Sequence, residues 1–180
     1  MLPIQKTIAV AAMILISGSV MAQGSQSNVR VDNLNQNQSG LLNKQELDLG
    51  NATAGGKSTV NVKNVNQNQS GLLNQQKLSV GNASGQGSAS TVNIQGNINQ
   101  NQTGLLNKQE ARIGNANSGG TSNVTVKNVT QTQSGLLNEQ KMAIGNSANS
   151  GKATVNIQGN VNQTQSGLLN KQSMKVGSAE

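Results

Sequence analysis

The side chains that carry out most enzyme chemistry are scarce in this sequence. Its 180 residues include no His and no Cys, and only two of its six acidic residues are aspartates, Asp32 and Asp48. No pair of acids recurs at a spacing suited to general acid–base catalysis or to metal binding. We therefore predict that the protein is not an enzyme and that it has no catalytic residue, cofactor or metal site.

Amide side chains, in contrast, recur in a strict pattern. The stretch NQNQSGLLN at positions 66–74 occurs in near-copies five times. An amide carries both a donor and an acceptor, so identical copies stacked above one another can form a hydrogen-bonded ladder. The first predicted ladder comprises Gln38, Gln69, Gln102, Gln133 and Gln165. The second comprises Asn43, Asn74, Asn107, Asn138 and Asn170. The third comprises Gln45, Gln76, Gln109, Gln140 and Gln172.

The Gly-Leu-Leu-Asn quartet sets the period of the chain. It recurs at intervals of 31, 33, 31 and 32 residues, and such a period is typical of a solenoid, a propeller or an array. We expect its glycines in turns that need an unusual backbone angle, and the asparagine that ends each quartet to tolerate such an angle too. The turn glycines are Gly40, Gly71, Gly104, Gly135 and Gly167. A repeat domain is predicted over residues 23–180, with repeats at residues 28–57, 58–89, 90–120, 121–152 and 153–180.

Two-residue alternation inside each repeat predicts β-strands. After the turn of the second repeat, Gln76, Leu78 and Val80 fall on one face of a strand and Lys77 falls on the other. In all five repeats the charges of this segment fall on the second face. They are Lys44, Glu46, Asp48, Lys77, Lys108, Glu110, Arg112, Glu139, Lys141, Lys171 and Lys175. The predicted fold class is all-β, a five-coil β-solenoid or cross-β stack of strand–turn–strand repeats, in which each coil buries its inner face by stacking on its neighbours.

One column of outward residues alternates in charge. It reads Glu46, Lys77, Glu110, Lys141 and Ser173 from the first repeat to the last. In a parallel, in-register stack these side chains would place opposite charges directly above one another, which favours this register over its alternatives.

The alternation slips once in each repeat, as between Val62 and Val65, where we expect a corner or a bulge. The third and fifth repeats carry an extra glycine at this place, Gly96 and Gly159. A glycine inside a strand pattern commonly marks such a bend.

The two leucines of each turn are apolar residues in a polar setting. We expect one leucine of each pair to fold inward and the other to form an exposed apolar row. An exposed row of this kind usually marks a contact surface.

The first residues are typical of a secretory signal peptide, predicted over residues 1–22. Lys6 precedes an apolar run at residues 7–16 that is too short to span a bilayer, and Val20-Met21-Ala22 fits a cleavage site. We expect the mature chain to begin at Gln23 and to be secreted.

Composition narrows the partners of the chain. It has no Cys and no Phe, Tyr or Trp, so an ordinary compact domain is not expected. Removal of Lys6 with the signal peptide leaves 12 Lys and Arg against 6 Asp and Glu. This excess permits contact with a polyanionic matrix. Without stacking aromatic residues, we expect no specific nucleic-acid binding.

The motif Gln-x-Gly-x-x-Asn, as in Gln69-Ser70-Gly71-Leu72-Leu73-Asn74, resembles the strand–turn–strand repeat of curlins, the secreted subunits of the bacterial extracellular amyloid curli. All five repeats match, over most of the predicted mature chain. The resemblance implies a functional-amyloid fibre subunit of a biofilm matrix. Its implied partners are further copies of itself, a related fibre subunit or nucleator, and an outer-membrane secretion apparatus. It also implies that Gln38, Gly40, Asn43 and their equivalents are steric and ladder positions.

The chain departs from curlins in three respects. Curlin repeats are shorter, they carry aromatic residues, and they usually have Ala where this chain has Gln45 and its equivalents. The longer unit, with three expected strand segments, is similar to that of Fap-type fibre subunits, another amyloid family of bacterial biofilms. Fap-type subunits are therefore the alternative family.

These features predict a secreted structural subunit that self-assembles into extracellular amyloid fibres at the cell surface, with a role in the biofilm matrix and in adhesion. The alternative is a monomeric β-solenoid adhesin or surface-binding protein. Monomeric solenoids need polar caps on their terminal repeats, whereas the first and fifth repeats here are full copies. The pattern therefore favours end-to-end growth.

Overall fold

The computed structural model describes residues 15–16, 26–42, 44–53, 57–85, 87–117, 121–147 and 151–177. The predicted signal peptide lies outside these residues apart from Leu15–Ile16, and the predicted ladder residue Asn43 lies outside them too. No helix within the described residues is long and apolar enough to cross a membrane.

Each coil consists of a long strand, a turn and a short strand. The long strands of the first four coils are β2 (Gln26–Ser39), β4 (Lys57–Ser70), β6 (Ala89–Thr103) and β8 (Thr121–Ser134). In the fifth coil the long strand is divided into β10 (Lys152–Ile157) and β11 (Val161–Ser166). The short strands are β3 (Lys44–Leu49), β5 (Gln75–Val80), β7 (Lys108–Ile113), β9 (Glu139–Ile144) and β12 (Lys171–Val176). A two-residue strand, β1 (Leu15–Ile16), precedes the first coil.

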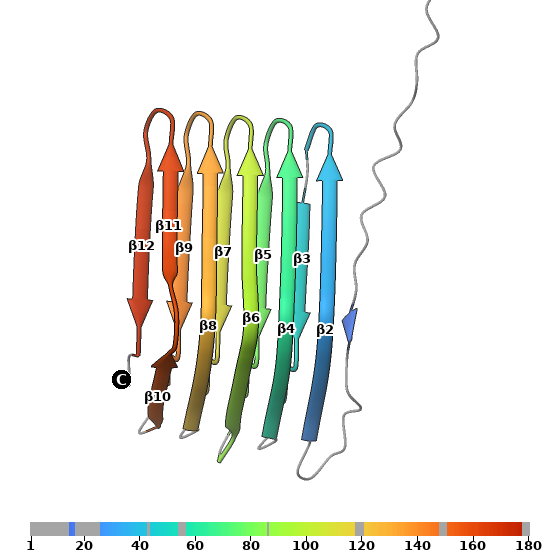
Figure 1. The fold of residues 1–180 in the computed structure, drawn as a ribbon, viewed down its shortest axis with the longest axis vertical. Coiled ribbons are helices and arrows are strands. Elements are labelled where there is room, and N and C mark those ends of the chain that lie inside the picture. The colour runs from blue at the N-terminus through green and yellow to red at the C-terminus, as the bar shows by residue number, and fades with distance from the viewer. Residues whose placement is uncertain are drawn as a thin grey trace, which may run out of the picture.

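The coils stack into two parallel sheets that face each other (Figure 1). One sheet has the order β1-β3-β5-β7-β9-β12, and the other has the order β10-β8-β6-β4-β2 with β11 also paired to β8. Equivalent residues of successive coils lie side by side, so that Gln69 pairs with Gln38 on one side and with Gln102 on the other. The predicted five-coil, all-β solenoid is confirmed.

The core lies between the two sheets and follows the predicted alternation. In β5 the side chains of Gln76, Leu78 and Val80 are buried, and Lys77 between them is partly exposed. From the opposite sheet, Ile98 and its equivalents pack into the same cluster. Among the described residues no charged side chain is buried. The two-residue period therefore sorted inner from outer faces correctly.

Glycine is required in the turn that joins the long strand to the short one. Gly104 has a φ angle of 129°, and a Cβ atom on it would lie 1.4 Å from the carbonyl oxygen of Gly71 in the preceding coil. Only a residue without a side chain allows the two turns to approach this closely. The predicted role of the turn glycine is thus confirmed, with stacking as an additional reason for it.

The other unusual backbone angle of each turn falls on the second leucine and not, as predicted, on the asparagine. The φ angles of Leu42, Leu73, Leu106, Leu137 and Leu169 lie between 56° and 59°. This left-handed conformation costs a residue with a Cβ atom roughly 1–2 kcal/mol.

The expectation that one leucine of each pair folds inward is also wrong. In the second coil Leu72 is 40% exposed and Leu73 is 43% exposed. The inner positions on either side of this turn are occupied by Gln69 and Asn74, which are buried. The amides therefore fill the interior at the turn, and both leucines face solvent.

The slip in alternation is a bulge within one long strand. The register of β4 against β6 shifts between Val62 and Val65. A Cβ atom on Gly96, the extra residue of the third coil, would lie 2.3 Å from the carbonyl oxygen of Lys63, so this position also needs glycine. In the first four coils the segment stays a single strand, and the third strand expected in each unit does not form.

A second arc returns the chain from the short strand to the next long strand. Its glycines, which the sequence pattern places only in polar loops, have φ angles of 68° to 72°. They are Gly50, Gly81, Gly114 and Gly145. A Cβ atom on Gly81 would lie 2.1 Å from Val92 Cγ2, and the hydroxyl of Ser90 donates to the Gly81 carbonyl oxygen. This arc is as closely packed as the first.

Candidate functional site

The first predicted ladder forms a continuous chain of side-chain hydrogen bonds inside the solenoid. Gln69 Nε2 donates to Gln38 Oε1 over 3.3 Å, and Gln102 Nε2 donates to Gln69 Oε1 over 3.2 Å. The chain continues to Gln133 and Gln165 with bonds of 3.1 and 3.2 Å. Each coil donates to the coil before it, so the Oε1 atom of Gln165 ends the chain. This atom is buried and has no hydrogen-bond partner among the described residues.

The glutamine ladder that follows the turn also ties the two sheets together. Gln109 Nε2 donates to Gln76 Oε1 over 2.8 Å and to the carbonyl oxygen of Thr132, in the opposite sheet, over 3.2 Å. Both donors of the amide group are used, so its burial leaves no unpaired N–H group. The ladder runs through Gln45, Gln76, Gln109, Gln140 and Gln172.

The asparagine ladder donates in the opposite direction along the stack. Asn74 Nδ2 lies 3.1 Å from Asn107 Oδ1 in the next coil and 2.7 Å from the carbonyl oxygen of Gly71. It also donates to the carbonyl oxygen of Thr103. The asparagine therefore closes its own turn and bonds it to the following coil. The described members of this ladder are Asn74, Asn107, Asn138 and Asn170.

The shortest ladder is one that the predicted set omits. Its four side-chain bonds are all 2.7 Å long, and Gln67, Gln100 and Gln131 within it are 0% exposed. The ladder runs through Gln36, Gln67, Gln100, Gln131 and Gln163. The alternation that places Gln69 inside also places Gln67 inside. Extending the ladder argument two residues towards the N-terminus would have identified it.

Asparagines on the outer face of the long strands form exposed ladders of the same kind. Asn68 Nδ2 donates to Asn37 Oδ1 over 2.9 Å, and Asn101 Nδ2 donates to Asn68 Oδ1 over 3.0 Å. In the fourth and fifth coils Thr132 and Thr164 take this position. Water can replace a lost bond here, so the outer ladder can end while the inner ladders continue.

The outward charge column has the predicted register but only part of the predicted pairing. Lys77 Nζ lies 2.7 Å from Glu46 Oε1 in the preceding coil. Glu110 instead pairs with Arg112 of its own strand at 2.5 Å, and Lys141 also pairs within its own strand. Outward neighbours along a strand are only slightly further apart than neighbours in adjacent coils, so long side chains can reach either.

These pairs give the folded chain a weak pH dependence. A hydrogen bond from Lys77 lowers the pKa of Glu46 below its ordinary value of 4.5, and one from Lys141 lowers the pKa of Glu139 in the same way. A lowered pKa stabilises the fold above the ordinary value, and this stabilisation is lost as the pH falls through the lowered pKa.

We expect the melting temperature to fall modestly from pH 7 to about pH 3, because these pairs are largely solvated. The double variant Glu46→Gln/Glu139→Gln should show a smaller fall when both proteins are melted by circular dichroism. Equal falls in the two proteins would show that the pairs contribute nothing.

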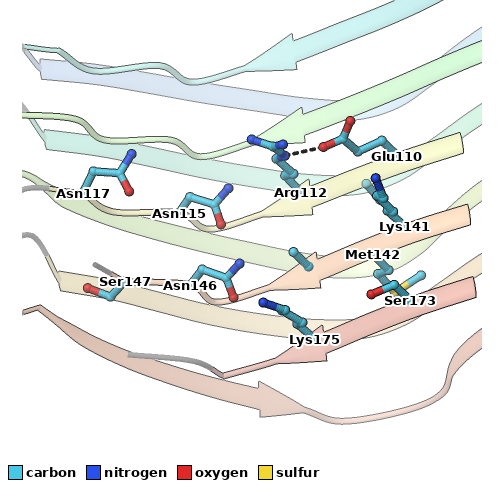
Figure 2. A pocket seen from close by; sticks show the side chains of 12 residues that line it. Glu110, Arg112, Asn115, Asn117, Lys141, Met142, Asn146, Ser147, Ser173 and Lys175 are labelled. Carbon is cyan, nitrogen blue, oxygen red and sulfur yellow. Dashed lines mark hydrogen bonds and ion pairs between the residues drawn. The ribbon is translucent and has the colours of Figure 1, made fainter. Parts of the chain in front are cut away.

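An open groove of about 480 Å³ lies on the outer face of the short-strand sheet (Figure 2). Ala143 lies between Arg112 and Lys175 of the adjacent coils there, so a small side chain leaves a gap between two long ones. Lys141 also lines the groove, and Glu110 is the acid in its lining. The excess of cations fits the expected contact with a polyanionic matrix, which stays a prediction.

The described residues contain no group of three or more His, Cys, Asp and Glu side chains that could hold a metal ion. No known protein family matches the chain, no curated protein is significantly similar to it, and no solved structure matches its fold. The resemblance to curlins therefore rests on the repeat motif alone.

Proposed function

We propose that the protein is a secreted structural subunit that assembles end to end into extracellular amyloid fibres. The observation that carries this proposal is the buried, unpartnered Oε1 atom of Gln165 at the end of the first ladder. Leaving a buried acceptor unpaired costs about 1–3 kcal/mol. The first coil of another copy would offer the Nε2 group of Gln38 at this position, because each coil donates to the one before it.

The last described coil exposes the face that the inner coils bury. Met174 and Val176 are each 43% exposed, whereas Met142 and Ile144, one coil earlier, are 2% and 0% exposed. β12 keeps the predicted register with β9 but has no strand on its other side within the described residues. Its free edge is a template for another strand, and stacking a further coil on it would cover the exposed side chains.

The bulges of the two ends of the stack are compatible with continued stacking. The fifth coil has the extra residue Gly159, and the first coil has no extra residue between Val31 and Leu34. The third coil, with Gly96, meets the fourth coil in the same combination. A junction between the fifth coil and the first coil of another copy therefore repeats a contact that the chain already makes.

The outward charges at the two ends also favour this junction. In continued register Lys175 would lie beside Asp48 of the next copy, and Ser173 would lie beside its Glu46. The like-charged pair in this arrangement is Lys171 beside Lys44, which Glu46 offsets. Two fifth coils facing each other would instead bring Lys171 and Lys175 together with their own copies.

At the other end of the stack, β1 pairs with β3 through Leu15 beside Asp48 and Ile16 beside Leu49. β1 lies within the segment that we expect to be removed on secretion. Cleavage before Gln23 would therefore free the edge of β3 for a fifth coil of another copy. Secretion, the biofilm matrix, adhesion and the nucleator and secretion partners are proposed from the signal-like N-terminus and the repeat motif.

The purified chain from Gln23 to Glu180 is expected to form unbranched fibres that bind amyloid dyes. Electron microscopy should show them after incubation in buffer, and fibre diffraction should give spacings near 4.7 Å and about 10 Å. A chain that stays monomeric for weeks at high concentration, with a β-rich circular dichroism spectrum, would contradict the proposal and fit the monomeric adhesin.

A matched pair of variants locates the growing end in the same experiment. Met174→Lys places a charge on the exposed inner face of β12 and should block elongation, as a polar cap does in monomeric solenoids. Ser173→Lys adds the same charge to the outer face of the same strand and should leave fibres intact. Equal elongation rates in the two variants would show that this face is not the growing end.

A further inference from the structure

An exposed ridge of leucines runs along one edge of the solenoid, at the turns that form the upper edge in Figure 1. The leucine ridge consists of Leu41, Leu42, Leu72, Leu73, Leu105, Leu106, Leu136, Leu137, Leu168 and Leu169. These side chains are 39–45% exposed in the three inner coils and 67–77% exposed in the two end coils. Backbone bonds such as Leu73 N to Leu105 O, 2.8 Å long, hold the turns in register. The ridge is therefore continuous, with a step of roughly 4.7–4.8 Å per coil.

The ridge is kept even though it strains the backbone. The second leucine of every turn has the left-handed conformation that glycine and asparagine adopt more easily. The chain uses glycine for this conformation in its second arc, as at Gly50 and Gly81. Stability of the fold alone would favour glycine or asparagine in the turn as well. The leucine side chains therefore serve a contact outside the fold.

One flank of the ridge is basic. The residues that open the short strands read Lys44, Gln75, Lys108, Glu139 and Lys171. The three lysines are exposed, and Lys108 and Lys171 form no ion pair with any described residue. A second copy would bring the same positive row to the contact, in a chain whose formal net charge is already +7. An anionic surface would neutralise the row instead.

We propose that the leucine ridge docks on the surface of an anionic lipid membrane. The leucines enter the boundary between headgroups and acyl chains, and the lysines of the flank contact the lipid phosphates. An apolar strip beside cationic side chains is the arrangement with which interfacial elements bind anionic bilayers. One chain of five coils carries the whole ridge, so the inference does not depend on fibre formation, although a fibre would multiply the contacts.

The test removes one leucine row without disturbing the fold. Asparagine tolerates the left-handed conformation, so Leu42→Asn/Leu73→Asn/Leu106→Asn/Leu137→Asn/Leu169→Asn should fold with an unchanged or higher melting temperature. Freshly prepared monomer is sedimented with vesicles of phosphatidylcholine alone or with about one third phosphatidylglycerol. We expect the parent chain to bind the anionic vesicles and the variant to bind them at least tenfold more weakly. A parent chain that does not bind, or a variant that binds equally well, would overturn the proposal.

Two charge variants separate the flank from general electrostatic attraction. Lys44→Gln/Lys108→Gln/Lys171→Gln removes the basic flank, and we expect at least a tenfold loss of binding to the anionic vesicles. Lys63→Gln/Lys127→Gln/Lys152→Gln removes the same charge from the other sheet and should weaken binding much less. Equal losses in both variants would contradict a role for the flank. Fibres of the asparagine variant that fail to bundle, with vesicle binding unchanged, would assign the ridge to copy–copy contact instead.

Discussion

Replacing Gln100 by lysine is expected to destabilise the folded chain by about 3–5 kcal/mol. Gln100 is 0% exposed, donates to Gln67 and accepts from Gln131, both over 2.7 Å. A lysine at this position would break both bonds and bury a charge in an interior where no described residue offers a counter-ion. Thermal melting of freshly prepared monomer should show the loss, and fibre assembly should slow strongly.

Two control variants divide this effect into its parts. Asn101→Lys makes the same substitution at the next residue, which lies on the outer face, and should change stability by less than about 1 kcal/mol. Gln100→Met keeps the approximate volume without a charge, and the unpaired amides above and below should cost about 1–3 kcal/mol. If Gln100→Lys and Asn101→Lys were equally destabilising, the assignment of inner and outer faces would be wrong.

Alanine in place of Gly104 is expected to destabilise the stack by at least about 3 kcal/mol. The new Cβ atom would lie 1.4 Å from the carbonyl oxygen of Gly71, so the second and third coils would have to separate at the turn. The φ angle of 129° adds strain of its own. The melting temperature of the monomer measures the loss.

Gly87 provides the matched control for this substitution. It also has a positive φ angle, 69°, but no atom lies within 4 Å of the place where its Cβ would be. Gly87→Ala should therefore cost only the backbone strain of roughly 1–2 kcal/mol. If both alanine variants melted together, the conformation of the turn, and not the close stacking of coils, would explain the glycine at position 104.

The sequence predicts the solenoid well because two independent patterns agree. The period of 31 to 33 residues fixes the number of coils, and the alternation along each short strand fixes which side chains face the core. Charge is the deciding signal, since an unpaired buried charge is too costly to occur by chance at one parity. The described Gln and Asn residues named from the sequence all lie in ladders, because in-register stacking places identical residues side by side.

The turn is where the sequence argument fails. Leucine is a poor residue for a left-handed angle, so the pattern favours Asn74 for it over Leu73. The structure reverses the two roles because Asn74 is needed inside the stack, where it donates to Gly71 and to Asn107. A local propensity cannot reveal a requirement that arises only when coils stack.

The ion pairs and the second arc are missed for related reasons. Glu110 can reach Arg112 or a lysine of the next coil, and exposed partners differ too little in free energy for register to decide between them. Gly81 lies in a stretch rich in Gly, Ser and Asn, which looks like an unstructured loop. The need for glycine at that position is set by Val92, a residue of the following strand.

A disulfide between two copies tests end-to-end assembly most directly. The chain has no cysteine, and positions 46 and 173 belong to one outward column, in the first and fifth coils. Within one copy they are four coils apart, roughly 19 Å at the usual strand spacing, which no disulfide can bridge. The variant Glu46→Cys/Ser173→Cys should form covalent multimers on mild oxidation of fibres, and the single variants should form at most dimers. Fibres of the double variant that release only monomers and dimers after oxidation would contradict the account.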